Sequence, residues 1–151
     1  MSDICIVDTS VLCNLLRVPN RDQQYAKALS ELDLYIDQGH SLLLPLATIY
    51  ETGNHIAQNG NGQQRRKTAE RFVDQVRQAV RGENPFRPTQ THQVEEVLEW
   101  LQMFPDRAMH GVGLADLTII QIFHQQCQLN RVRQVFIWSY DQHLSGYNRS
   151  P

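Results

Sequence analysis

Near its start the chain reads Ile4-Cys5-Ile6-Val7-Asp8-Thr9-Ser10-Val11-Leu12, a run of apolar residues that is interrupted by an aspartate and two hydroxyl residues. Short apolar runs rich in β-branched residues are typical of buried strands, so we predict a strand that ends at Val7. Asp8 would then lie at the carboxyl end of that strand, the edge where open α/β sheets bind ligands. An Asp-Thr-Ser triplet is also a common helix N-cap, and this alternative interpretation stays open at the level of the stretch alone.

The length and charge of the chain limit its class. A chain of 151 residues fits one domain, so we predict a single domain over residues 1–151. The 14 Lys and Arg against 16 Asp and Glu give a formal net charge of −2, which argues against a polycation that coats nucleic acid or anionic membrane. No apolar run approaches the roughly 18 residues of a spanning helix, and no basic leader precedes the first strand. We therefore expect a cytoplasmic protein with no membrane contact.

The cysteines and histidines do not form a recognisable site. The three cysteines, Cys5, Cys13 and Cys127, are odd in number and far apart, which is unsuited to a disulfide framework and typical of a reducing cytoplasm. The six histidines show no His-Glu-x-x-His pair and no zinc-finger spacing. Zinc is therefore not expected.

The order of the predicted elements indicates the fold class. Apolar residues at helical spacing predict helices over residues 11–16, 22–38, 63–81, 92–104 and 114–128, with a further helix that begins at Thr48. Pro105 is expected to end the helix over 92–104. Short apolar runs predict strands at 41–46 and 135–138, and a short strand near Phe86. This alternation predicts a three-layer α/β/α fold with a central, mainly parallel sheet of about four or five strands.

The helix over 63–81 is strongly basic. Residues 65–87 hold seven Lys and Arg against three acidic residues. One interpretation is a solvated helix whose charges pair along its surface. The other is a ridge that contacts nucleic-acid phosphates through Arg65, Arg66, Lys67 and Arg71.

Two predicted strands, the first and the last, each end in an aspartate beside a serine. Asp8 is followed by Ser10, and Ser139 precedes Asp141. If these strands are neighbours where the strand order of the sheet reverses, both carboxylates face one crevice. Glu51, on the helix after the second strand, and Asp116, at a helix start, can point to the same place.

Four carboxylates that converge with no lysine nearby would repel one another. A divalent cation removes this repulsion, and oxygen ligands without Cys or His suit Mg²⁺ or Mn²⁺. Such an ion can activate a bound water and stabilise an in-line displacement at phosphorus. The acidic residues therefore predict a metal site for phosphoryl chemistry.

Four stretches around these acids resemble the four acidic motifs of PIN-domain nucleases, in the same order along the chain. The stretches are Val7-Asp8-Thr9-Ser10-Val11-Leu12, Leu44-Pro45-Leu46-Ala47-Thr48-Ile49-Tyr50-Glu51, Gly113-Leu114-Ala115-Asp116-Leu117 and Trp138-Ser139-Tyr140-Asp141. The resemblance extends from Ile4 to about Leu144. It implies a PIN-like fold.

The resemblance also implies a function: a Mg²⁺- or Mn²⁺-dependent endoribonuclease that hydrolyses phosphodiester bonds of single-stranded or structured RNA. It implies an acidic quartet that holds the metal, with serine side chains supporting it by hydrogen bonds: Asp8, Glu51, Asp116 and Asp141, with Ser10 and Ser139. Many bacterial PIN domains of this size are VapC-like toxins, which form homodimers and are silenced by an antitoxin protein in the acidic groove. The long basic segment over residues 59–91 departs from the compact pattern of those toxins.

Two alternatives to a nuclease are a phosphotransfer protein of the aspartyl type and a non-catalytic binding module. Phosphotransfer domains of the aspartyl type need a lysine near the later strands, whereas the only lysines here are Lys27 and Lys67. Haloacid-dehalogenase-like phosphatases also need a second aspartate where this chain has Ser10. The remaining alternative is a PIN-like module that binds RNA or protein without turnover, against which the retention of all four acids argues.

Overall fold

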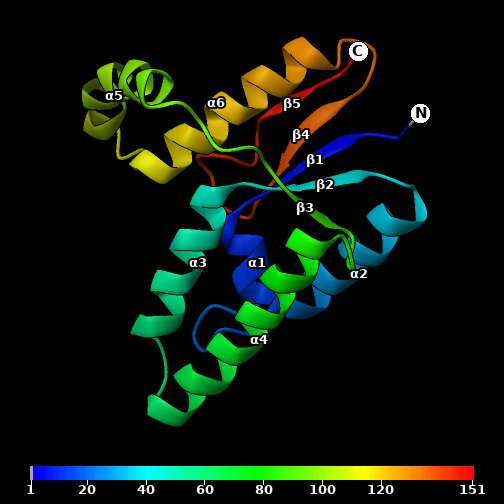
Figure 1. Ribbon diagram of the computed structural model, residues 1–151, viewed down its shortest axis with the longest axis vertical. Coiled ribbons are helices and arrows are strands. Elements are labelled where there is room, and N and C mark those ends of the chain that lie inside the picture. Colours follow the sequence, from blue (N-terminus) through cyan, green and yellow to red (C-terminus); the bar gives the residue numbers. More distant parts are fainter. Residues whose placement is uncertain (1) are drawn as a thin grey trace.

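The first strand, β1 (Ile4–Val7), lies at the centre of the sheet and all four of its residues are buried. Cys5 and Val7 pack into the core on one face of the sheet, and Ile4 and Ile6 into the core on the other face. A strand that is covered on both faces has no polar side, which explains its uninterrupted apolar sequence. The computed structural model describes residues 2–151. Strand β1 lies between β2 and β4 (Figure 1) and contributes to two hydrophobic cores.

The sheet has five strands in the order β3-β2-β1-β4-β5. Strands β2 (Ser41–Leu44) and β3 (Phe86–Pro88) continue from one side of β1, and β4 (Val135–Trp138) pairs with its other side. These four strands are parallel, and β5 (Asn148–Arg149) is antiparallel to β4. The strand order therefore reverses between β1 and β4, and the crevice for a ligand is expected at their carboxyl ends.

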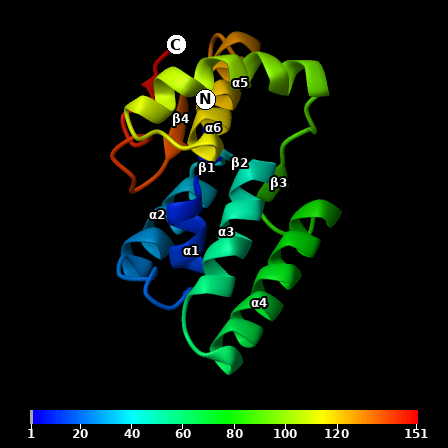
Figure 2. The ribbon, with the colours of Figure 1, turned by 90° about the vertical axis from the view of Figure 1, so that its left-hand side faces the viewer.

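Helices cover both faces of the sheet, as Figures 1 and 2 show. One core holds residues of α1 (Thr9–Leu15), α3 (Leu46–Gln58) and α4 (Gly62–Arg81), with α2 (Tyr25–Asp37) packed against it. The other core is covered by α6 (Leu114–Leu129), and α5 (Val94–Met109) packs on α6. The expected three-layer α/β architecture is confirmed. Within residues 2–151, every helix falls short of the length and apolar character needed to cross a membrane.

The helix predicted to stop at Pro105 continues to Met109 as α5, so that prediction was wrong. A proline inside a helix removes the hydrogen bond to the carbonyl four residues earlier, here that of Leu101. Both Pro105 and Leu101 are exposed, so water can bond to that carbonyl and the helix tolerates the proline.

Two helices also begin at other residues than expected. Helix α2 begins at Tyr25 instead of residue 22, because the side chain of Asn14 accepts a hydrogen bond from the backbone of Gln24 and holds the preceding residues as a loop. Helix α3 begins at Leu46 instead of Thr48, and Pro45, with φ −64°, leads directly into it. The basic helix α4 covers the predicted range and begins with a capping box between Asn61 and Gln64.

One hydrogen bond fixes α3 against the end of β1. Thr48, in the first turn of α3, is fully buried, and its hydroxyl donates to the carbonyl of Val7 over 2.8 Å. Val7 is the last residue of β1 and pairs with Trp138, the last residue of β4. The starts of α1 and α3 and the end of β4 are therefore held at one point.

Replacing Thr48 by Val should destabilise the protein, because the isosteric side chain removes the donor and leaves the buried carbonyl of Val7 without this partner. We expect a loss of about 1–3 kcal/mol in the free energy of unfolding, measured by urea denaturation. Thr52→Val is the matched control, since the hydroxyl of Thr52 is equally buried and has no hydrogen-bond partner in residues 2–151. Equal losses in the two variants would contradict this role of Thr48.

Candidate active site

Asp8 directly follows β1 and is the N-cap of α1. Its side chain is buried, and its Oδ2 accepts hydrogen bonds from the Ser139 hydroxyl at 2.7 Å, the Ser10 hydroxyl at 2.8 Å and the Ser10 backbone N–H at 3.3 Å. Asp8 therefore caps α1 through Oδ2, as the N-cap interpretation of the Asp-Thr-Ser triplet predicts, while its Oδ1 carries no hydrogen bond within residues 2–151.

The two serines join the end of β4 to the start of α1. The Ser10 hydroxyl accepts a hydrogen bond from the backbone N–H of Tyr140 at 3.0 Å, and the Ser139 hydroxyl accepts one from the N–H of Asp141 at 2.9 Å. Asp141 is further fixed because its Oδ1 accepts from the backbone N–H of His143 at 2.8 Å. The turn after β4 is thus held against α1, with Asp141 in the same cleft as Asp8.

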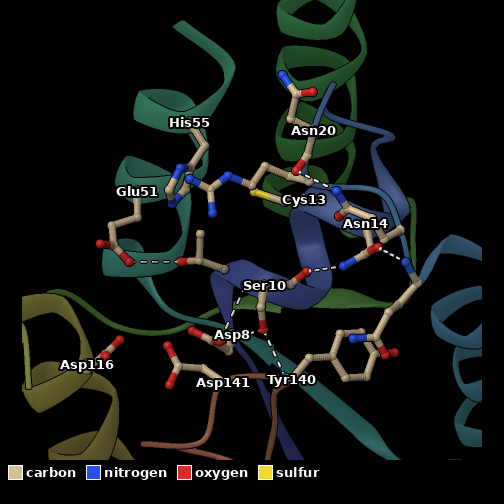
Figure 3. Close-up of a pocket in the computed structure, with 14 residues that line it drawn as sticks. Asp8, Ser10, Cys13, Asn14, Asn20, Glu51, His55, Asp116, Tyr140 and Asp141 are labelled. Carbon is tan, nitrogen blue, oxygen red and sulfur yellow. Dashed lines mark hydrogen bonds between the residues drawn. The ribbon is translucent and has the colours of Figure 1, made fainter. Parts of the chain in front are cut away.

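Asp116 and Glu51 reach this cleft from two other helices. Asp116 is in the first turn of α6, and Figure 3 shows its carboxylate directed toward those of Asp8 and Asp141. Glu51 lies on α3, set apart from these three, and its Oε2 accepts a hydrogen bond from the Thr9 hydroxyl at 3.2 Å. All four predicted acidic residues line one cleft of about 580 Å³.

The charges of these carboxylates act on one another. The pKa of Asp116 is raised from 3.8 to about 7. Burial is the largest cause, and the negative charges of Asp8, Asp141 and Glu51 also contribute, because they add unfavourable negative charge beside this carboxylate. The cleft is therefore electrostatically ready to accept a cation.

Mg²⁺ and Mn²⁺ suit the donors in this cleft by their chemistry. The donors are carboxylate and hydroxyl oxygens, which hard divalent cations prefer. Within residues 2–151, however, no three His, Cys, Asp or Glu side chains are close enough to form a finished metal site. The oxygen donors are of the type that such a cation prefers and they line one cleft, but the carboxylates lie too far apart for three of them to bind one cation together.

Asn14 is buried in α1 and has a role that the sequence motifs did not predict. Its Nδ2 donates to the carbonyl of Ser10 at 2.7 Å, and its Oδ1 accepts from the backbone N–H of Gln24 at 2.8 Å. Asn14 thus holds the loop over residues 17–24, called here the rim loop, along the edge of the cleft. An asparagine in an otherwise apolar helix, four residues after Ser10, is the signal that could have indicated this.

The basic residues predicted to contact nucleic acid do not line the cleft. Arg65, Arg66 and Lys67 are exposed in the first half of α4, and Arg66 pairs with Glu70 at 3.2 Å. Arg71 instead donates to the carbonyl of Leu16 at 2.8 Å. It therefore attaches α4 to the end of α1, which is a structural contact.

The chain was compared with known proteins. No family model matches it, and no curated protein matches its sequence. Its structure is similar to the crystal structure of FitAcB from Neisseria gonorrhoeae, with a TM-score of 0.59 and 20% sequence identity over 92% of this chain and 88% of that chain. At this identity the likeness shows a shared fold. The PIN-like α/β fold expected from the four acidic motifs is thereby confirmed.

Asp116 should make the stability of the metal-free protein depend on pH. Its pKa is higher in the folded chain, so the stability that it contributes is complete below about pH 4 and is lost as the pH rises through about 7. Asp116→Asn, which removes the charge, should therefore stabilise the protein more at pH 8 than at pH 5. We expect a difference of about 1–2 kcal/mol after allowing for solvent screening.

The measurement is urea denaturation in the presence of a chelator at both pH values. Asp106→Asn, at an exposed position of α5, is the control and should change stability equally at the two pH values. A gain for Asp116→Asn that does not depend on pH would contradict the electrostatic explanation.

Proposed function

We propose that this chain is a Mg²⁺- or Mn²⁺-dependent endoribonuclease that hydrolyses phosphodiester bonds in single-stranded or structured RNA. The observation that carries the proposal is the meeting of four carboxylates in one cleft at the carboxyl ends of β1 and β4. The motif resemblance and the PIN-like fold agree with it. None of these observations depends on the basic helix α4.

Asp8, Glu51, Asp116 and Asp141 are the residues that would hold the cation. When bound, a cation of this kind neutralises charge at phosphorus and supplies an activated water. Ser10 and Ser139 act on Asp8 alone, since their hydroxyls hold Oδ2 and so fix the direction of Oδ1. Asp116 carries a proton near neutral pH and would release it from its carboxyl group as positive charge enters the cleft.

The proposal extends to partners through the resemblance to VapC-like toxins. On that basis the chain is a cytoplasmic toxin of a toxin–antitoxin pair, assembles as a homodimer, and is silenced by an antitoxin protein that occupies the acidic cleft. A cationic side chain of such an antitoxin would find the uncompensated negative charge described above.

One observation favours a second candidate function. Within residues 2–151 the carboxylates are not gathered into a finished metal site, which also suits a PIN-like module that binds RNA or a protein without turnover. The two functions differ in one measurable property. The nuclease cleaves RNA when a divalent cation is present, whereas the binding module does not cleave RNA.

Asp8→Asn should lower the rate of RNA cleavage by at least about 100-fold, because it removes the negative charge from the best-oriented carboxylate. The assay combines Mn²⁺ or Mg²⁺ with single-stranded and hairpin RNAs, and a chelator should stop wild-type cleavage. Asp33→Asn, at an exposed position of α2, is the charge-matched control and should cleave as the wild type does. Cleavage that survives Asp8→Asn or the chelator would refute the proposal, and RNA binding without cleavage would support the second function.

The basic helix can be tested separately. If Arg65, Arg66 and Lys67 contact phosphates, replacing all three by Ala should weaken RNA binding and lower the slope of log affinity against log salt by about 2 for a single strand. Arg131→Ala, an exposed arginine before the amino end of β4, should leave the slope unchanged. An unchanged slope in the triple variant would assign these residues to a solvated surface.

A further inference from the structure

The acidic cleft has a second wall that the proposed chemistry does not use. This wall consists of residues of the rim loop and one residue of α3: Asn20, Arg21, Gln23, Gln24 and His55. Figure 3 shows Asn20 and His55 on the side of the cleft away from Asp116 and Asp141. Asp116 and Asp141 therefore lie at one end of the cleft, and His55 lies at the other end, on α3 with Glu51.

The rim loop is held in place from three sides. Asn14 of α1 binds the backbone of Gln24, and Arg71 of α4 binds the carbonyl of Leu16 just before the loop. The turn between α3 and α4 also packs on it, since a Cβ added to Gly60 would lie 3.0 Å from the ring of Pro19. A loop that is already held in place can position a ligand without the entropy cost of becoming ordered on binding.

Arg21 is the only lysine or arginine on this wall. Within residues 2–151 its guanidinium makes no ion pair and no hydrogen bond. Arg17, on the same loop, differs because it pairs with Asp22 at 3.7 Å and lies over the ring of Tyr25. A guanidinium without a partner at the edge of a cleft is suited to bidentate binding of a phosphate.

His55 also lines this wall, and one of its ring nitrogens lacks a hydrogen-bond partner in the described part of the chain. The Nδ1 of His55 is buried and has no hydrogen-bond partner within residues 2–151. A buried polar atom without a partner costs free energy, and a ligand recovers it only if the side chain of His55 turns so that Nδ1 becomes accessible from the cleft. Arg21 and His55 both line the cleft, His55 on the side away from Asp116 and Asp141, and Glu51, on the same helix as His55, lies on this side too.

We infer that Arg21 and His55 form a positioning subsite for a phosphate of the substrate strand that is not the one cleaved. The inference rests on the proposed ribonuclease function for the identity of the strand. A polynucleotide carries a phosphate on every residue, so a strand with one phosphate at the carboxylates presents the next ones along the cleft. Held at the rim, the strand is placed for reaction at the acidic end.

The test measures binding of a fluorescent single-stranded RNA octamer by anisotropy at several salt concentrations, in the Asp8→Asn background so that turnover does not interfere. Arg21→Gln should weaken binding by about 10-fold and lower the salt slope by about 0.7. Arg21→Lys should restore the slope. Arg17→Gln is the matched control and should leave affinity and slope unchanged, because Arg17 does not line the cleft.

His55→Leu should weaken binding by several-fold, and His55→Gln should recover part of the loss by supplying a hydrogen-bonding group. In the cleavage assay, Arg21→Gln should raise KM with little change in kcat, as expected for a residue that only holds the substrate. Melting temperatures of the Arg21 variants should match that of the wild type, because Arg21 is exposed, whereas His55→Leu removes a buried nitrogen without a partner in residues 2–151 and should not lower the melting temperature.

The outcomes separate this inference from the proposed function. If RNA is cleaved while Arg21→Gln binds RNA with unchanged affinity and salt slope, the subsite is refuted and the nuclease stands. If no cleavage is found but binding depends on Arg21 as described, the subsite stands and the nuclease fails. If Arg17→Gln weakens binding as much as Arg21→Gln, or if no RNA binds, the subsite is refuted.

Discussion

The structure depends on the parallel pairing of β1 with β4 and on the register of that pairing. Because Val7 lies opposite Trp138, the next residues, Asp8 and Ser139, leave the sheet side by side and form a hydrogen bond of 2.7 Å. A slip of one residue would turn these side chains to opposite faces of the sheet. The two hydrophobic cores, which take alternate residues of β1, hold this register and so hold the site.

The cleft concentrates negative charge at a cost in stability, and the surrounding structure limits that cost. The hydroxyls of Ser10 and Ser139 and the backbone N–H of Ser10 donate to Asp8, while burial, followed by the charges of the neighbouring carboxylates, raises the pKa of Asp116. Sites prepared for a ligand commonly carry this kind of unrelieved repulsion. The same feature makes the cleft a place for a cation.

The basic and polar residues divide into those that hold the fold and those that are free to bind. Asn14 attaches the rim loop to α1 and Arg71 attaches α4 to the end of α1, whereas the guanidinium of Arg21 on the rim loop has no partner within residues 2–151. The strongly basic helix α4 therefore helps to position α1, one of the helices that form the cleft, through the hydrogen bond from Arg71 to Leu16.

The sequence by itself determined the elements and the candidate residues, because buried strands and amphipathic helices leave patterns over neighbouring residues. The apolar run at β1, the helical spacing of α4 and the acids at Asp8 and Asp141 were all visible without coordinates. The two-residue strand β5, the rim loop and the roles of Asn14 and Arg71 were decided only by the tertiary structure. Their contacts join residues far apart in the chain, and such contacts leave no local periodicity because they form only when the cores bring distant segments together.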